Sequence, residues 1–123
     1  MANILRNFQD YEGAIEIYSN LIQYSNYSAE EYADLLYKRG TSYERKKDFL
    51  KADEDLIESL KIDPDEPYVL NYLGYSWLER SYKIPEAMDM LKEAYSLREN
   101  DPYITDSIGW AYYLIEDLSL IHI

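Results

Sequence analysis

Three glycines stand at matching positions of a repeated pattern, and their spacing constrains the fold of this chain more than any other feature. Gly109 follows Gly74 by 35 residues, and Gly74 follows Gly40 by 34. Each lies in a stretch where aliphatic and aromatic residues recur at helical intervals. A glycine inside a helix costs about 1 kcal/mol relative to alanine, so three in one register imply that a second helix packs closely against each. The sequence therefore predicts a repeated helical unit of roughly 34 residues.

A second amphipathic segment follows the first two glycines. In the clearest copy, Ala87 comes thirteen residues after Gly74, and Leu91 comes four residues later. Ala52 and Leu56 repeat this arrangement after Gly40, and an earlier copy begins near Ala14 with its first helix nearly missing. We expect helices at about 10–24, 30–46, 49–61, 67–80, 85–98 and 102–116, with a frayed stub near 2–8.

The composition also favours an all-α chain. One Val and two Thr occur among 123 residues, so the β-branched enrichment of a sheet would rest on Ile alone. The four prolines, at positions 64, 67, 85 and 102, divide the second half into blocks of helical length.

The repeated pattern resembles that of the tetratricopeptide repeat family, whose units carry Leu, Gly, an aromatic residue, Ala, a second Leu or aromatic residue, a small residue and Pro. The matching residues are Leu36, Gly40, Tyr43, Ala52, Leu56 and Pro64, and then Leu70, Leu73, Gly74, Trp77, Ala87, Leu91 and Ala94. Arg39 and Ser59 depart from the pattern at positions that are usually apolar or small, and one residue is inserted before Ala87.

This resemblance implies an α-solenoid of antiparallel helix pairs, with about three repeats and incomplete ends. It implies one domain over 1–123, divided into a partial repeat 1–28, repeats 29–66 and 67–101, and a partial repeat 102–123. Tyr43, Trp77 and Tyr112 are expected in the packed seam between helices. Ile108, Tyr112 and Ile115 would face a missing partner helix, so we expect a fragment of a longer array or a homodimer formed through the C-terminal helix.

In such arrays the first helix of each pair lines a concave wall, and the residues expected on it can be counted from each glycine. They are Tyr37, Thr41, Tyr68, Asn71, Tyr75, Tyr103, Asp106, Trp110 and Tyr113. Asn71 could contact a peptide backbone, whereas Asp106 would repel a carboxylate. The predicted ligand is therefore a peptide or protein segment with apolar or aromatic anchors and some Lys or Arg.

Charge narrows the classes of partner. The chain has 12 Lys and Arg against 24 Asp and Glu, a net charge of −12, which opposes binding to nucleic acid or to an anionic membrane. No signal peptide or membrane span is visible, and the compartment, cytoplasmic or periplasmic, stays open.

Catalytic, cofactor and metal sites are not expected. The chain has no Cys, its one histidine is His122 near the C-terminus, and its four glycines are too far apart for a phosphate loop. Two functions remain: a protein-interaction module, or a structural segment of a longer array whose exposed ends mediate self-association.

Overall fold

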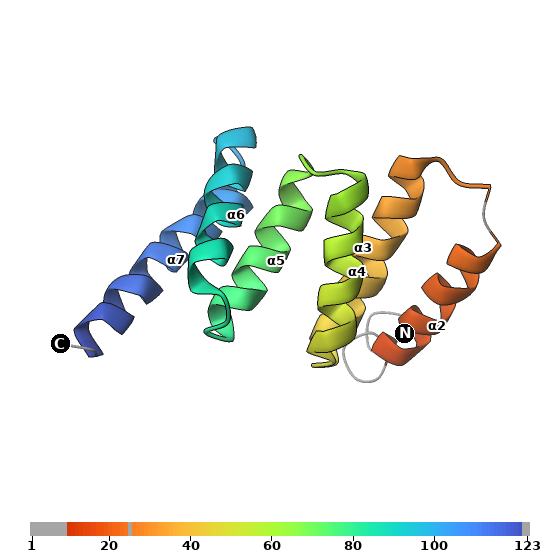
Figure 1. Ribbon diagram of the computed structural model, residues 1–123, viewed down its shortest axis with the longest axis horizontal. Coiled ribbons are helices and arrows are strands. Elements are labelled where there is room, and N and C mark those ends of the chain that lie inside the picture. Colours follow the sequence, from red (N-terminus) through yellow and green to blue (C-terminus); the bar gives the residue numbers. More distant parts are fainter. Residues whose placement is uncertain (1–9, 25, 122–123) are drawn as a thin grey trace. The chain divides into compact units, whose positions relative to one another are not determined.

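The computed structural model describes residues 10–24 and 26–121, with side chains described as far as residue 116. These residues form six α-helices and no strand, which confirms the all-α prediction (Figure 1). The helices are α2 (Asp10–Gln23), α3 (Ala29–Arg45), α4 (Phe49–Ile62), α5 (Pro67–Glu79), α6 (Ile84–Leu97) and α7 (Pro102–Ile121). Five agree with the predicted bounds to within two residues, whereas α7 continues five residues beyond the predicted end at 116. The stub expected near 2–8 lies outside the described residues.

The chain divides into two compact units, and the boundary in the sequence lies between Pro64 and Asp65. The first unit holds α2, α3 and α4, and the second holds α5, α6 and α7. Short connections join α3 to α4 and α5 to α6 as antiparallel pairs, the arrangement of an α-solenoid repeat.

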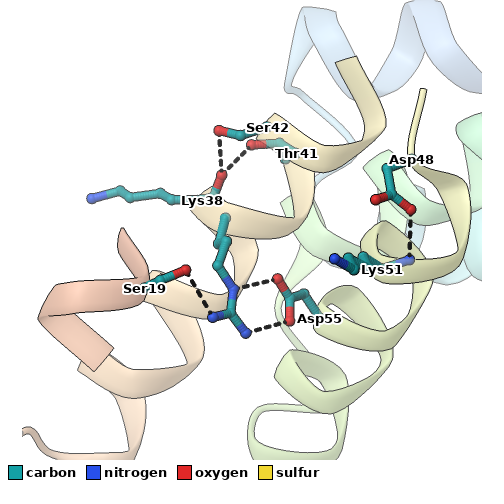
Figure 2. A network of polar contacts seen from close by, with 8 residues as sticks. Ser19, Lys38, Thr41, Ser42, Asp48, Lys51 and Asp55 are labelled. Carbon is teal, nitrogen blue, oxygen red and sulfur yellow. Dashed lines mark hydrogen bonds and ion pairs between the residues drawn. The ribbon is translucent and has the colours of Figure 1, made fainter. Parts of the chain in front are cut away.

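In the first unit, local capping signals fix where the helices begin. Ser28 and Glu31 form a reciprocal capping box at the start of α3. Asp48 caps α4 by accepting a hydrogen bond from the backbone N–H of Lys51 at 3.4 Å (Figure 2). Leu36 and Leu56 fill the core between these two helices.

Arg39 and Ser59, the two residues that depart from the repeat pattern, both form hydrogen bonds with a neighbouring helix. Arg39 makes a two-pronged contact with Asp55, with Nε–Oδ2 and Nη2–Oδ1 distances of 2.7 and 2.8 Å. Its remaining nitrogen donates to Ser19 on α2 at 3.2 Å (Figure 2). The buried Ser59 hydroxyl donates to the carbonyl of Ala33 at 2.8 Å. Both departures therefore connect neighbouring helices and leave the helix-pair architecture intact.

In the second unit, the connection before α6 accommodates the inserted residue. Ser81 and Lys83 both take left-handed backbone conformations, with φ of 55° and 47°, whereas the α3–α4 connection has only one such residue, Lys47. Two left-handed residues allow the longer loop to turn and still deliver Ala87, 0% exposed, beneath Gly74.

Candidate peptide-binding surface

The second unit has an open hollow of about 560 Å³ between α5 and α7, which we call the α5–α7 hollow. It is lined by Tyr75, Tyr103, Asp106, Ser107 and Trp110. The structure thus brings together four of the nine predicted wall residues. Tyr103 is 53% exposed and Trp110 is 46% exposed, so both rings are accessible to a ligand.

A hydrogen-bonded contact connects the starts of α5 and α7, the two helices that line this hollow. The hydroxyl of Tyr68 on α5 donates to Asp101, which directly precedes α7. The other carboxylate oxygen of Asp101 accepts hydrogen bonds from the backbone N–H groups of Tyr103 and Ile104 at 2.9 and 3.2 Å. Tyr68 was predicted on the wall. The structure places it outside the lining of the hollow, where its hydroxyl connects α5 to the residue before α7.

Aromatic stacking extends the surface along α7. The rings of Trp110 and Tyr113 lie nearly parallel, with their centroids 5.1 Å apart. Tyr113 is exposed, and although it does not line the hollow it forms one stacked pair with a residue that does. A planar or cationic ligand group would find two adjoining ring faces here.

The hollow combines these rings with one negative charge. Asp106 contributes its carboxylate, and no Lys or Arg is found among the described residues that line the hollow. Burial raises the pKa of Tyr75, and the nearby Glu79 and Tyr103 raise it further. Tyr75 therefore keeps its hydroxyl proton at neutral pH and can donate a hydrogen bond.

Asn71 was placed on the wall incorrectly. It is 1% exposed, and its side-chain oxygen has no hydrogen-bond partner among the described residues. The physical reason is that α5 is buried around more than half of its circumference, because the buried residues Ser76, Leu73, Leu70 and Asn71 follow one another around the helix. The prediction counted positions from the glycine and assumed that the helix has a broad solvent-exposed face. The exposed face of α5 is narrow and does not include Asn71.

Tyr37 and Thr41 belong to α3 in the first unit, where both are half-buried. Thr41 lines a separate cleft of about 420 Å³ between α2 and α3, which we call the α2–α3 cleft. Sequence reasoning did not find this cleft or assign a role to its two cations, Lys38 and Arg45. Lys38 is paired with Asp34 at 2.9 Å, and this hydrogen bond is the main reason that the pKa of Lys38 is raised.

Ser107 is a second residue that the sequence did not single out. It lines the α5–α7 hollow although only 7% of it is exposed, and its hydroxyl donates to the carbonyl of Tyr103 at 3.0 Å. Its position between Tyr103 and Trp110 on the helix could have indicated it.

Comparison with known proteins agrees with the repeat seen in the helices. A sequence model described as the tetratricopeptide repeat matches residues 33–66, which cover most of α3 and all of α4. The TPR repeat-containing protein PA4667 of Pseudomonas aeruginosa is 35% identical over 80 residues, which are 65% of this chain and 14% of that protein. Residues 33–66 thus match one tetratricopeptide repeat, and the six described helices are consistent with an α-solenoid of such repeats. Tetratricopeptide repeats are generally protein–protein interaction modules.

The repeated pattern makes the surroundings of Gly109, in the middle of α7, informative. In the described part of the chain, a Cβ atom added at Gly109 would meet no atom within 4 Å. Around Gly109 lies an open groove of about 390 Å³ between α6 and α7, lined by Lys92, Tyr95, Thr105, Ile108, Gly109 and Tyr112, which we call the α6–α7 groove.

Tyr112 in this groove corrects a prediction. It was expected in the packed seam of the repeat and also facing a missing partner helix, and its 51% exposure contradicts the first of these expectations. The equivalent Trp77 is buried, at 7% exposure, and Tyr43 is half-buried. Those two residues belong to repeats whose second helix is present, whereas no described helix covers Tyr112 on the groove side.

Two further properties of the described residues concern other classes of site. Among the side chains described, those of residues 10–24 and 26–116, no three from His, Cys, Asp or Glu lie close enough together to hold a metal ion. Among the helices described, none combines the length and the apolar character needed to cross a membrane.

Proposed function

We propose that this chain is a protein-interaction module whose second unit binds a peptide or protein segment in the α5–α7 hollow. The proposed ligand carries apolar or aromatic side chains together with Lys or Arg. The observation that carries this proposal is the lining itself, in which Tyr103 and Trp110 present exposed rings on either side of Asp106 along α7. We propose no catalytic role for the chain.

The chemistry of the lining supports a basic, partly apolar ligand. A guanidinium or ammonium group over an aromatic ring gains about 0.5–2 kcal/mol, depending on how far it is desolvated. Asp106 adds an opposite charge next to those rings, and the net charge of −12 would hasten the encounter with a cationic partner. The same field disfavours nucleic acid, and we propose that nucleic acid is not a partner.

Two defined peptides test the proposal. One carries Leu and Phe with several Lys and Arg, and the other is identical except that Glu replaces each basic residue. Fluorescence anisotropy of labelled peptides should show saturable binding of the basic peptide and at least tenfold weaker binding of the acidic one. Equal binding of both peptides, or none, would refute the proposed ligand class.

Variants locate the binding. Tyr75→Ala combined with Trp110→Ala should abolish binding of the basic peptide while the circular dichroism of the helices is retained. Asp106→Lys should reverse the preference in favour of the acidic peptide. Because Asp106 is exposed, this variant should keep its fold, and it tests the location of binding even if the double variant unfolds. Tyr24→Ala is the matched control, because Tyr24 is 83% exposed and lies in the first unit. A loss of binding in the control equal to that in the double variant would contradict the proposed location.

A second candidate function is self-association, with the chain acting as a structural segment that dimerises through α7. The observation that favours it is the open space around Gly109, where the other repeats hold a packed helix. Static light scattering over a range of protein concentrations tests it, and a mass that stays at that of one chain throughout would exclude it.

A further inference from the structure

The three glycines that repeat along the chain differ in what covers them. A Cβ atom at Gly40 would lie 2.9 Å from Leu56 on α4, and one at Gly74 would lie 2.9 Å from the Ala87 carbonyl on α6. At Gly109 the same position is open among the described residues. The α6–α7 groove therefore has the shape of a site for a helix equivalent to α4 and α6, with a small residue facing the glycine and a larger apolar residue one turn later.

Helix α2 has the sequence of such a second helix. Ala14 stands at the position of Ala52 and Ala87, and Tyr18 stands at the position of Leu56 and Leu91. No residue of α2 is fully buried. This helix thus carries the small residue and the ring needed to cover a glycine.

Ile17 gives the clearest sign that this face of α2 is uncovered. It stands at the repeat position of Asp55 and Met90. A Cβ atom added at Gly40 would lie 3.1 Å from the Cβ of Asp55, and one added at Gly74 would lie 3.2 Å from the Cβ of Met90. In α2 the residue is apolar and 60% exposed. In the other two repeats, the residue at this position contacts the first helix of the pair. The exposed isoleucine therefore marks a face of α2 that no first helix covers in the described part of the chain.

The α2–α3 cleft is the corresponding site for a first helix. In the second unit, α5 packs against both α6 and α7. Because α2 corresponds to α6 and α3 corresponds to α7 in the repeat, a helix like α5 would lie against α2 and α3. The cleft between those two helices is open, about 420 Å³, and Ala14, Ile17 and Tyr18 form its α2 side.

We propose that α2 of a second copy of this chain occupies the α6–α7 groove, while α7 of the first copy occupies the α2–α3 cleft of the second. This inference rests on the self-association proposed above and names the surfaces that form it. One contact fills both sites, because α7 of one copy and α2 of the other become the two helices of a shared repeat.

Charge favours this pairing. Helices α2 and α7 each carry three carboxylates and no Lys or Arg. The α6–α7 groove instead offers Lys92. The α2–α3 cleft offers Arg45 and Lys38, of which Lys38 is paired with Asp34, against one carboxylate in its lining, that of Asp10. In a chain with twice as many acidic as basic residues, cations at both sites reduce the repulsion between two copies.

The contact is heterologous, since two different surfaces meet. A heterologous contact leaves one free α2 end and one free α7 end after two copies have joined, so assembly continues unless the ends close into a ring. A contact between two copies of α7 would instead stop at a dimer.

Two single variants and their mixture test this inference by multi-angle light scattering. Gly109→Glu places a charged side chain in the α6–α7 groove, and the open space there allows the free chain to keep its fold. Ile17→Glu places one on the exposed face of α2. We expect the unmodified chain to exceed 14.6 kDa as concentration rises, and each variant alone to remain at one chain.

The mixture distinguishes the two kinds of contact. The Gly109→Glu chain keeps an intact α2, and the Ile17→Glu chain keeps an intact α6–α7 groove, so an equimolar mixture should form a 1:1 pair and grow no further. If Ile17→Glu associates like the unmodified chain while Gly109→Glu does not, the pairing with α2 is wrong although self-association stands. An unmodified chain that stays at one copy would overturn both. Tyr24→Ala is again the control and should associate normally.

Discussion

Arg39 shows how one residue can depart from the repeat pattern and still support the fold. Its guanidinium grips both oxygens of Asp55, which is 6% exposed, and the hydrogen bond to Asp55 is the main cause of the raised pKa of Arg39. The contact to Ser19 extends the network to α2. The sequence showed that Arg39 was unusual, but its partner lies 16 residues away and depends on how α3 and α4 pack.

Asp55→Ala should destabilise the first unit substantially. It leaves the partly buried Arg39 without its carboxylate, and breaking such a pair costs about 2–4 kcal/mol. Urea unfolding followed by circular dichroism measures the loss. The double variant Arg39→Leu with Asp55→Leu should be less damaging than Asp55→Ala, because it removes both charges together. A double variant that is less stable than Asp55→Ala would contradict this reading.

The Tyr68–Asp101 contact predicts a pH-dependent difference between two proteins. The hydrogen bond from Tyr68 is the main cause of the lowered pKa of Asp101, so this contribution to stability is present above the ordinary pKa of 3.8 and is lost as pH falls through the lower folded value. The hydrogen bond to Asp101 is in turn the main cause of the raised pKa of Tyr68. That contribution is present below the ordinary pKa of 10.0 and is lost as pH rises through the higher folded value.

Tyr68→Phe removes the contact without removing the ring. Its melting temperature should therefore fall slightly below that of the unmodified chain between about pH 5 and 9, and the two should converge in more acidic and more alkaline solution. Thermal unfolding across pH measures this. Tyr24→Phe, at an exposed position, should follow the unmodified chain at every pH.

At the scale of elements, helix existence and approximate bounds followed from apolar spacing, prolines and caps. Those signals are local, and for that reason they could be read from the sequence. The burial of α5 over most of its circumference could not, because it depends on neighbours brought by the fold, and Asn71 was misplaced as a result. The division into repeats at 28, 66 and 101 stays a prediction.

The same substitution at two equivalent glycines should have opposite effects. In Gly74→Ala the new methyl group would lie 2.9 Å from a backbone carbonyl and 3.0 Å from Leu91 Cγ, so α5 and α6 must shift apart. Overpacking of this kind costs about 1–3 kcal/mol. In Gly109→Ala the methyl group enters open space, and helix propensity should add about 0.5–1 kcal/mol of stability.

Chemical unfolding at low protein concentration, where association is weak, compares the two variants. Equal losses at Gly74 and Gly109 would mean that a helix covers Gly109 after all. The comparison is informative because the two sites share a sequence register and differ in the presence of the second helix.

At the scale of the whole molecule, the sequence predicted a resemblance to the tetratricopeptide repeat family and a binding surface of nine residues, and the structure brings only part of that surface together. Tyr75, Tyr103, Asp106 and Trp110 lie together in the second unit. Tyr37 and Thr41 lie in the first unit, and a wall that combines the two sets stays a prediction. The periodicity identifies which residues share a register, whereas the shape of a hollow depends on side-chain packing around it.

Net charge predicts how the folded state responds to salt. With 24 acidic and 12 basic residues, the compact chain repels itself. Sodium chloride added from low to physiological ionic strength should raise the melting temperature by about 2–5 °C, because screening relieves this repulsion. Sucrose of equal osmolarity is the control for non-ionic effects. A melting temperature that falls with sodium chloride would show that attractive ion pairs such as Lys46–Glu12 dominate instead.

The chain has two tryptophans, and their contrasting environments supply a pair of intrinsic optical reporters. Trp77 is buried and meets Tyr82 edge-on at 5.4 Å, whereas Trp110 is 46% exposed beside Tyr113. Emission from Trp77 follows unfolding, and emission from Trp110 follows whatever covers the α5–α7 hollow. Acrylamide, which is neutral, is a better quencher than iodide because the net charge of −12 repels an anion. A ligand that protects Trp110 from acrylamide while leaving Trp77 unchanged would thus report occupancy of that surface without any label.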